Sequence, residues 1–192
     1  GHGENASNND FSIDLFTKNV ITFLLENKIE SINIFGYSMG GYDALNLAVK
    51  APEYVNKIVT LGTKFNWTPE TAAKEVKMLN PNVIEEKVPA FAKHLEVTHH
   101  KNNWKAVLNK TAKMMLELGD NRTLTHKVLE SIKQNVLVGI GSKDKMVSIE
   151  ESQESVTSLP NATLQIVEGF PHQIEKTDQE QLVSIITTFI NS

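Results

Sequence analysis

The chain has 192 residues, of which 40% are hydrophobic and 22% charged, as is typical of one globular domain with a sizeable core. Its net charge is only −4, and no cluster of lysine or arginine could neutralise a phosphate backbone, so we expect no nucleic-acid partner. It has no cysteine, no apolar run of about 18 residues and no basic-then-apolar leader, which excludes a thiol nucleophile and predicts a cytoplasmic protein without membrane contact.

The first third of the chain predicts helix, strand, helix and strand, in that order. Apolar residues recur at helical spacing over 15–27, and a short β-branched run at 31–35 is typical of a buried strand. A second helix over 40–50 and a second strand over 57–62 follow. Because a strand, a helix and a further strand form a crossover unit, we expect a parallel sheet.

The middle of the chain has a different character. Residues 64–133 show long helical patterns and no convincing strand, which predicts a helical insertion. The alternation of strands and helices then resumes, with strands expected at 135–140 and 163–167 and helices at 148–159 and 178–190. The chain is therefore expected to be an α/β protein with one insertion.

A glycine-rich segment, Gly36-Tyr37-Ser38-Met39-Gly40-Gly41, lies between the first predicted strand and the second predicted helix. Its Gly-x-Ser-x-Gly form predicts a sharp turn that exposes the Ser38 hydroxyl. Such a turn forces serine into an unfavourable backbone conformation, and we expect Gly36 and Gly40 to leave the space that it needs. The turn also directs the backbone N–H of Met39 to where an oxyanion would form. The alternative is a turn that only joins strand to helix.

Serine is a weak nucleophile and needs a general base, together with an acid that orients the base. Asp144 follows the strand at 135–140, and His172 follows the strand at 163–167. Open α/β sheets place functional residues at this carboxyl edge. Taken singly, Asp144 fits a helix N-cap and His172 a surface loop. The chain order Ser38, Asp144, His172 nevertheless predicts the triad of a serine hydrolase.

Four segments carry a resemblance to a known superfamily: the turn around Ser38, Gly-Ser-Lys-Asp-x-x-Val around Asp144, Gly-Phe-Pro-His at His172, and Ala-Pro-Glu-Tyr-Val at 51–55. Together they resemble the α/β-hydrolases. The resemblance implies a mostly parallel sheet flanked by helices, with residues 1–63 and 134–192 as the core and 64–133 as a helical cap. It implies Ser38 as nucleophile, His172 as base and then acid, and Asp144 as the residue that orients His172. No cofactor and no metal are implied.

The start of the chain departs from the family pattern. The family's second oxyanion donor comes from a His-Gly loop after an early strand, and the 192 residues begin too late to contain that strand. The segment at 1–5 more closely resembles a later Gly-His-Gly turn. We therefore expect either roughly 60 to 80 further residues upstream, or a second copy of the chain that covers the open edge of the strand at 31–35.

The function that the sequence predicts is hydrolysis of a small or medium carboxylic ester, thioester or related carbonyl substrate through an acyl-enzyme, as in a carboxylesterase. Serine at the turn argues against epoxide and haloalkane hydrolysis, which in this superfamily usually needs aspartate there. Amidases, C–C bond hydrolases and some lyases use the same triad, so the substrate stays open. The alternatives are a non-catalytic binding module of the same fold and an incomplete piece that lacks the oxyanion loop.

The predicted cap holds two further groups of side chains. Three histidines lie near Glu96, but their spacing is not that of a metal site on a helix, and we interpret them as solvated cap residues: His94, His99 and His100. A second group either lines an apolar acyl pocket or packs the cap, and its members are Trp67, Trp104, Met114 and Met115.

Overall fold

The computed structural model describes residues 1–5 and 7–192. They form two compact units, which are described separately. The sheet unit comprises Ile13–Asn66 and Thr123–Ser192, and the helical unit comprises Gly1–Ser12 and Trp67–Arg122. The boundaries expected from the sequence, with a cap at 64–133, stay a prediction. No helix within the described ranges has the length and apolarity needed to cross a membrane.

The sheet unit is built on four parallel strands in the spatial order β1-β2-β3-β4. The strands are β1 (Ile32–Tyr37), β2 (Val55–Leu61), β3 (Asn135–Gly141) and β4 (Ala162–Val167). The helices are α1 (Ile13–Glu26), α2 (Met39–Lys50), α7 (His126–Leu129), α8 (Ile149–Ser158) and α9 (Gln179–Asn191), with short 3-10 turns at Pro52–Tyr54 and Ile174–Lys176. The parallel sheet confirms the predicted α/β class. Within the described residues β1 pairs with β2 alone, so β1 is an edge strand.

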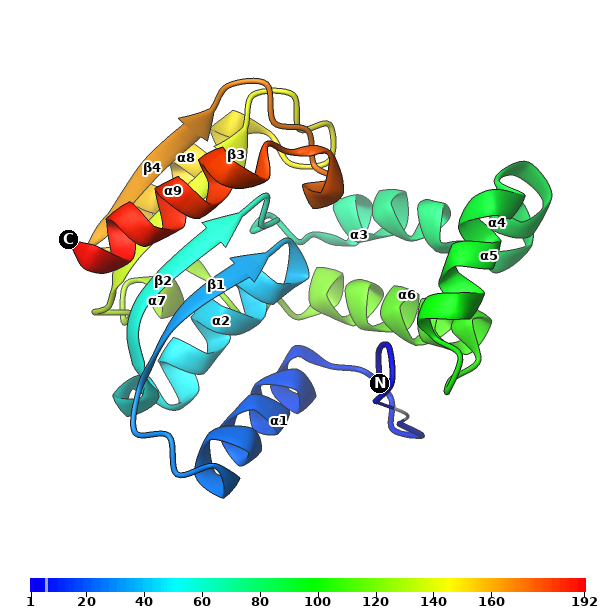
Figure 1. The fold of residues 1–192 in the computed structure, drawn as a ribbon, viewed down its shortest axis with the longest axis horizontal. Coiled ribbons are helices and arrows are strands. Elements are labelled where there is room, and N and C mark those ends of the chain that lie inside the picture. The colour runs from blue at the N-terminus through cyan, green and yellow to red at the C-terminus, as the bar shows by residue number, and fades with distance from the viewer. Residues whose placement is uncertain (6) are drawn as a thin grey trace. The chain divides into compact units, whose positions relative to one another are not determined.

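Helices cover both faces of this sheet, and its strands are therefore apolar runs. Figure 1 shows α9 on one face and α8 on the other. In the central strands, the side chains of Ile58 in β2 and Ile140 in β3 are completely buried. Under α9 a cluster of Leu61, Val167, Phe170 and Leu182 fills the space between helix and sheet. This packing fixes the carboxyl ends of the strands, where the predicted site residues lie.

The helical unit contains α3 (Pro69–Glu75), α4 (Pro81–Lys87), α5 (Pro89–Thr98) and α6 (Trp104–Asp120), with a 3-10 turn at Val76–Leu79. Proline stands at the first position of α3, α4 and α5, where its missing N–H costs no helical hydrogen bond. Caps by Thr68, Asn80 and Asn103 fix the starts of α3, α4 and α6. A small apolar cluster joins α4, α5 and α6, and it consists of Ile84, Ala92, Leu95 and Leu108.

Candidate active site

Ser38 alone makes the turn from β1 to α2, because β1 ends at Tyr37 and α2 begins at Met39. Its φ of 52° and ψ of −117° are unfavourable for a residue with a side chain. Two hydrogen bonds to the end of β2 and the residues after it hold the turn. The Ser38 N–H donates to the carbonyl of Leu61 (2.8 Å), and the Ser38 carbonyl accepts from the hydroxyl of Thr63 (3.0 Å).

The turn needs two glycines, and one of them is not the residue expected from the sequence. A Cβ on Gly36 would lie 2.5 Å from the Gly40 carbonyl oxygen, and a Cβ on Gly41 would overlap the Thr63 hydroxyl. The expectation for Gly40 is wrong, because a Cβ there meets no neighbouring atom within 4 Å. Gly41 faces β2, while Gly40 is exposed. The second glycine of the Gly-Gly pair is therefore the one that the close approach requires.

Ser38, His172 and Asp144 form one chain of hydrogen bonds at the carboxyl edge of the sheet. Nδ1 of His172 lies 2.8 Å from Oδ2 of Asp144, and Nε2 lies 3.2 Å from Oγ of Ser38. An imidazole protonated on Nδ1 donates to the carboxylate and leaves Nε2 free to accept the serine proton. The side chains of His172 and Asp144 are 8% and 2% exposed, so water competes little for these bonds.

The carboxylate of Asp144 is held at both oxygens. While Oδ2 faces His172, Oδ1 accepts from the backbone N–H groups of Met146 (2.8 Å) and Val147 (2.9 Å). Burial alone would raise the pKa of Asp144, but the hydrogen bonds from His172, Val147 and Met146 outweigh it, and the pKa lies below its usual value. Asp144 is therefore an anion at neutral pH, oriented by bonds on both sides.

The loops that carry Asp144 and His172 are joined by three hydrogen bonds. Ser142 donates its N–H to the carbonyl of Val167 (2.9 Å), and its hydroxyl accepts from the N–H of Gly169 (2.8 Å). The N–H of Lys143 donates to the carbonyl of Phe170 (3.0 Å). The contribution of Ser142 was not foreseen, because a serine in a loop carries no sequence signal for a partner 27 residues away.

Two further residues contact the histidine. The ring of Tyr37 is tilted by 45° to that of His172, with centroids 5.4 Å apart. Gly62 has a φ of 61°, and a Cβ there would lie 3.0 Å from Asp144 Oδ2 and 3.2 Å from His172 Nδ1. A glycine at the end of the strand expected at 57–62 was the available signal for this close approach.

The predicted oxyanion donor Met39 is the first residue of α2. Backbone N–H groups in the first turn of a helix have no partner within the helix, and the helix dipole adds partial positive charge there. Met39 directly follows Ser38, so its N–H lies in this first turn of α2.

The interpretation of three cap histidines as solvated holds for His94 and His100, which are exposed, but is wrong for His99, which is buried. His99 accepts a hydrogen bond from the N–H of Gly3 (2.9 Å), and Glu96 forms an ion pair with Lys93 (2.6 Å). In the part of the chain that the structure describes, no three His, Cys, Asp or Glu side chains are grouped as a metal site would require. Trp67 and Met114, from the predicted apolar group, are buried.

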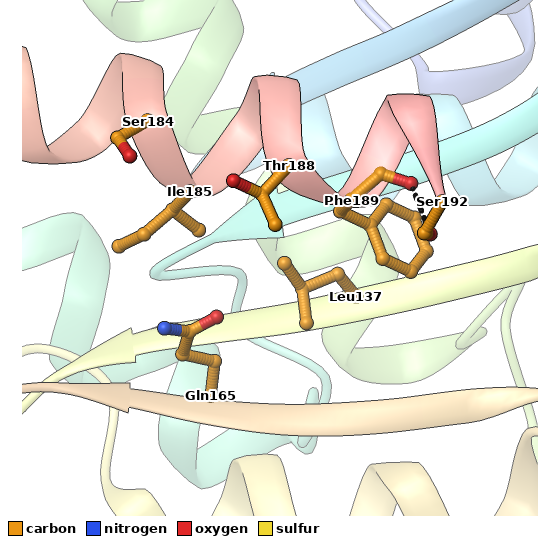
Figure 2. Close-up of a pocket in the computed structure, with 7 residues that line it drawn as sticks. All are labelled: Leu137, Gln165, Ser184, Ile185, Thr188, Phe189 and Ser192. Atoms are coloured by element: carbon orange, nitrogen blue, oxygen red, sulfur yellow. Dashed lines mark hydrogen bonds between the residues drawn. The ribbon is translucent and has the colours of Figure 1, made fainter.

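A pocket of about 330 Å³ lies between α9 and the strands β3 and β4 (Figure 2). Its walls combine apolar side chains with hydroxyl groups of α9, and they are Leu137, Gln165, Ser184, Ile185, Thr188, Phe189 and Ser192. It contains none of the three triad residues and no titratable side chain. This pocket therefore offers no side chain that could act as an acid or a base.

Comparisons with known proteins agree on the fold. A Haemophilus influenzae protein provisionally described as an esterase/lipase is 22% identical over 213 residues, covering 99% of this chain and 71% of that protein. The crystal structure of E-2-(acetamidomethylene)succinate hydrolase superposes with a TM-score of 0.77 at 16% identity, covering 100% of this chain and 79% of the other. A carboxylesterase structure from Nitrososphaera gargenis superposes with a TM-score of 0.77 at 16% identity, covering 100% of this chain and 76% of the other.

The parallel sheet and these structural relatives show that the chain has the α/β-hydrolase fold, as the sequence predicted. Residues 1–180 match the profile of one hydrolase family, described as serine aminopeptidase, S33. The chain belongs to this S33 family and is an enzyme of the α/β-hydrolase class.

Proposed function

We propose that this chain hydrolyses small or medium carboxylic esters through an acyl-enzyme on Ser38. The observation that carries the proposal is the unbroken hydrogen-bond chain from Ser38 Oγ through His172 to the buried Asp144, with distances of 3.2 and 2.8 Å. A base within hydrogen-bond reach of the nucleophile, oriented in turn by a third group, is the arrangement that serine activation requires.

In the first half of the reaction, Ser38 Oγ attacks the acyl carbon while its proton passes to His172 Nε2. The tetrahedral intermediate collapses when the ester C–O bond breaks, and His172 returns the proton to the departing alkoxide. In the second half, water attacks the acyl-serine, gives its proton to Nε2, and the acid leaves as Ser38 Oγ is reprotonated. Asp144 stays ionised throughout and stabilises the imidazolium of His172. The lowered pKa of Asp144 favours its ionised form.

The N–H of Met39 is the proposed donor to the carbonyl oxygen as negative charge develops on it. Its place at the start of α2 supports this role, because a fixed N–H needs no reorganisation when the charge appears. Removing one such donor from a serine hydrolase typically costs about 10² to 10³ in turnover. No part of this mechanism calls for a metal or an organic cofactor.

Two comparisons favour an ester substrate. The Haemophilus relative is provisionally described as an esterase/lipase, and one structural relative is a carboxylesterase. The name of the family supports a second candidate, cleavage of an amide at an amino-terminal residue. A p-nitrophenyl butyrate assay beside an alanine p-nitroanilide assay separates the two activities, since the first substrate is an ester of a plain acyl group and the second is an amide of an amino acid with a free amino group.

The test of the proposal is covalent labelling by a fluorophosphonate, followed by intact-mass measurement. We expect one adduct on the wild-type chain and none on Ser38→Ala or His172→Ala. Matched controls are Ser184→Ala and His100→Ala, which alter exposed residues of the same types. Absent labelling of a folded wild-type chain, or labelling that survives in Ser38→Ala, would refute the proposal.

A further inference from the structure

A single carboxylate on α8 holds the segment that follows β2. Oε1 of Glu151 accepts from the backbone N–H groups of Phe65 and Asn66, both at 2.7 Å. Oε2 lies 3.7 Å from Nζ of Lys64. The side chains of Glu151 and Lys64 are only 12% and 15% exposed, so these bonds are partly shielded from water. Glu151 thereby binds three consecutive residues that lie 85 to 87 positions away in the chain.

The other end of the same segment contacts the candidate active site. The hydroxyl of Thr63 donates to the Ser38 carbonyl (3.0 Å), and the N–H of Gly62 donates to the carbonyl of Gly139 (3.0 Å). Gly62 lies so close to Asp144 and His172 that a Cβ would come within 3.2 Å of both. Residues 62–66 are therefore held by the serine turn at one end and by Glu151 at the other.

The segment has no regular structure of its own between Gly62 and α3. Its N–H groups at 65 and 66 depend on Glu151, and the Phe65 side chain is buried at 4% exposure. Without the carboxylate, both donors would lose this partner, and because the N–H of Phe65 is partly buried, the segment would shift to give it a new one. A shift of even about 1 Å near reacting groups costs on the order of 10²-fold in rate.

We propose that Glu151 is a positioning residue of this hydrolase, which acts on the Ser38 turn and on the Asp144–His172 pair through residues 62–66. The inference rests on the proposed function of Ser38. This positioning role can be told apart from a general stabilisation of α8. Glu150 shares the first turn of α8 with Glu151, and both carboxylates favour the helix equally through the helix dipole, so only the positioning role is particular to Glu151.

The experiment compares Glu151→Ala, Glu151→Gln and the exposed control Glu150→Ala. Glutamine keeps one oxygen for the two N–H donors, whereas alanine keeps none. In p-nitrophenyl butyrate hydrolysis we expect kcat to fall on the order of 10-fold to 100-fold in Glu151→Ala, with KM changed less than about threefold. We expect the kcat of Glu151→Gln to lie within about threefold of the wild-type value. We expect the kcat of Glu150→Ala to equal the wild-type value. The fluorophosphonate labelling rate should follow kcat.

Folding is checked in parallel by thermal unfolding and by hydrogen exchange of the peptide that contains residues 62–66. Faster exchange there in Glu151→Ala than in Glu150→Ala, with rescue by glutamine, is the expected result. Equal exchange and equal kcat in the two alanine variants would overturn the inference, as would a loss in Glu151→Ala that vanishes after correction for the folded fraction. If the wild type itself is not labelled, the proposed function fails, and hydrogen exchange still decides whether Glu151 holds the segment.

Discussion

Ser38 keeps a left-handed backbone because its neighbours leave no better arrangement. Its N–H is bonded to Leu61 at the end of β2, and its carbonyl is bonded to Thr63 just beyond that strand. Gly36 and Gly41 allow this close contact between the turn and the strand. Strain of this kind costs on the order of 1–3 kcal/mol and persists only where the surroundings fix it. The conformation places Oγ beside His172, so the strained residue and the proposed nucleophile are the same.

The two outer glycines of the Gly-x-Ser-x-Gly motif should respond differently to alanine. Gly36→Ala brings a Cβ within 2.5 Å of the Gly40 carbonyl oxygen, and we expect a loss of at least about 1–3 kcal/mol in unfolding free energy. Gly40→Ala meets open space in a helix, and we expect a change between zero and a gain of about 1 kcal/mol. Urea denaturation of both variants measures this, and equal effects would contradict the assignment of Gly36 as the crowded position.

Asp144→Asn should leave the fold intact and remove most of the activity. Because two backbone N–H groups bind Oδ1, the asparagine oxygen is expected to keep that side and its NH₂ group to face His172. Nδ1 must then accept, Nε2 carries the proton, and the imidazole cannot take the proton of Ser38. We expect kcat to fall about 10²- to 10⁴-fold. The kinetic control is Asp120→Asn, an exposed carboxylate, and a loss below tenfold would count against the role of Asp144.

How far these residues follow from the sequence depends on how local their signals are. Ser38 and Met39 stand in a contiguous motif, and Asp144 and His172 each follow a recognisable strand, so all four were named in advance. Gly41 was missed because the motif does not tell which glycine of the pair faces β2. Glu151 was missed because its partners Phe65 and Asn66 are brought to it only by the fold.

At the scale of elements, the pairing of α1 with α2 rests on a polar cluster. The Asn46 side chain donates to Asp14 (3.0 Å) and to the Thr17 hydroxyl (2.8 Å), and the Thr17 hydroxyl lies 2.5 Å from Asp43. Thr17 and Asn46 are each 1% exposed. Burial raises the pKa of Asp43 to about 6, the Thr17 hydrogen bond opposes this, and the charge of Asp14 adds to it.

This cluster predicts a pH-dependent stability. Between the unfolded pKa of Asp, about 3.9, and the folded pKa of about 6, the native state holds a proton that the unfolded state has released. Stability therefore falls as pH rises through this window and stays lower above it. Asp43→Asn accepts the same Thr17 bond without a charge, and we expect it to raise unfolding free energy at pH 7.5 by on the order of 2 kcal/mol.

The measurement is urea denaturation of wild type and Asp43→Asn at pH 4.5, 5.5, 6.5 and 7.5. The difference between the two proteins should grow over the first three points and then level off. Asp14→Asn is the companion variant, since it removes the neighbouring charge and, with it, the exposed ion pair with Lys50 (3.3 Å). A difference that is the same at all four pH values would show that Asp43 does not titrate in this window.

The elements themselves were largely predictable from sequence. All four strands and the four longer helices of the sheet unit, α1, α2, α8 and α9, were expected from the sequence. The strands follow from short continuous apolar runs, which burial on both faces of a parallel sheet selects, and the helices follow from helical spacing of apolar residues. Within residues 64–133 the sequence predicts helices but not their boundaries. Pro69, Pro81 and Pro89 mark the starts of α3, α4 and α5 in the structure, and they were the signal that remained unused.

At the scale of the whole molecule, the two compact units differ in how well their cores are buried. Central strand residues of the sheet unit, such as Ile58, Val136 and Ile140, are at most 1% exposed. In the helical unit Met114 is also only 1% exposed, but the apolar cluster of α4, α5 and α6 has side chains that are 5% to 9% exposed and includes an alanine. Less apolar area removed from water means less stabilisation, so the helical unit is expected to open more easily.

Both tryptophans, Trp67 and Trp104, belong to the helical unit, which makes their fluorescence a selective probe of it. In urea we expect the fluorescence transition at a lower midpoint than the loss of hydrogen-exchange protection in β2 and β3. The two transitions are measured on the same samples, with exchange pulses at each urea concentration. Because two-state unfolding requires that all probes coincide, superimposable curves would mean that the units unfold as one, and that the weaker core of the helical unit is stabilised by the rest of the chain.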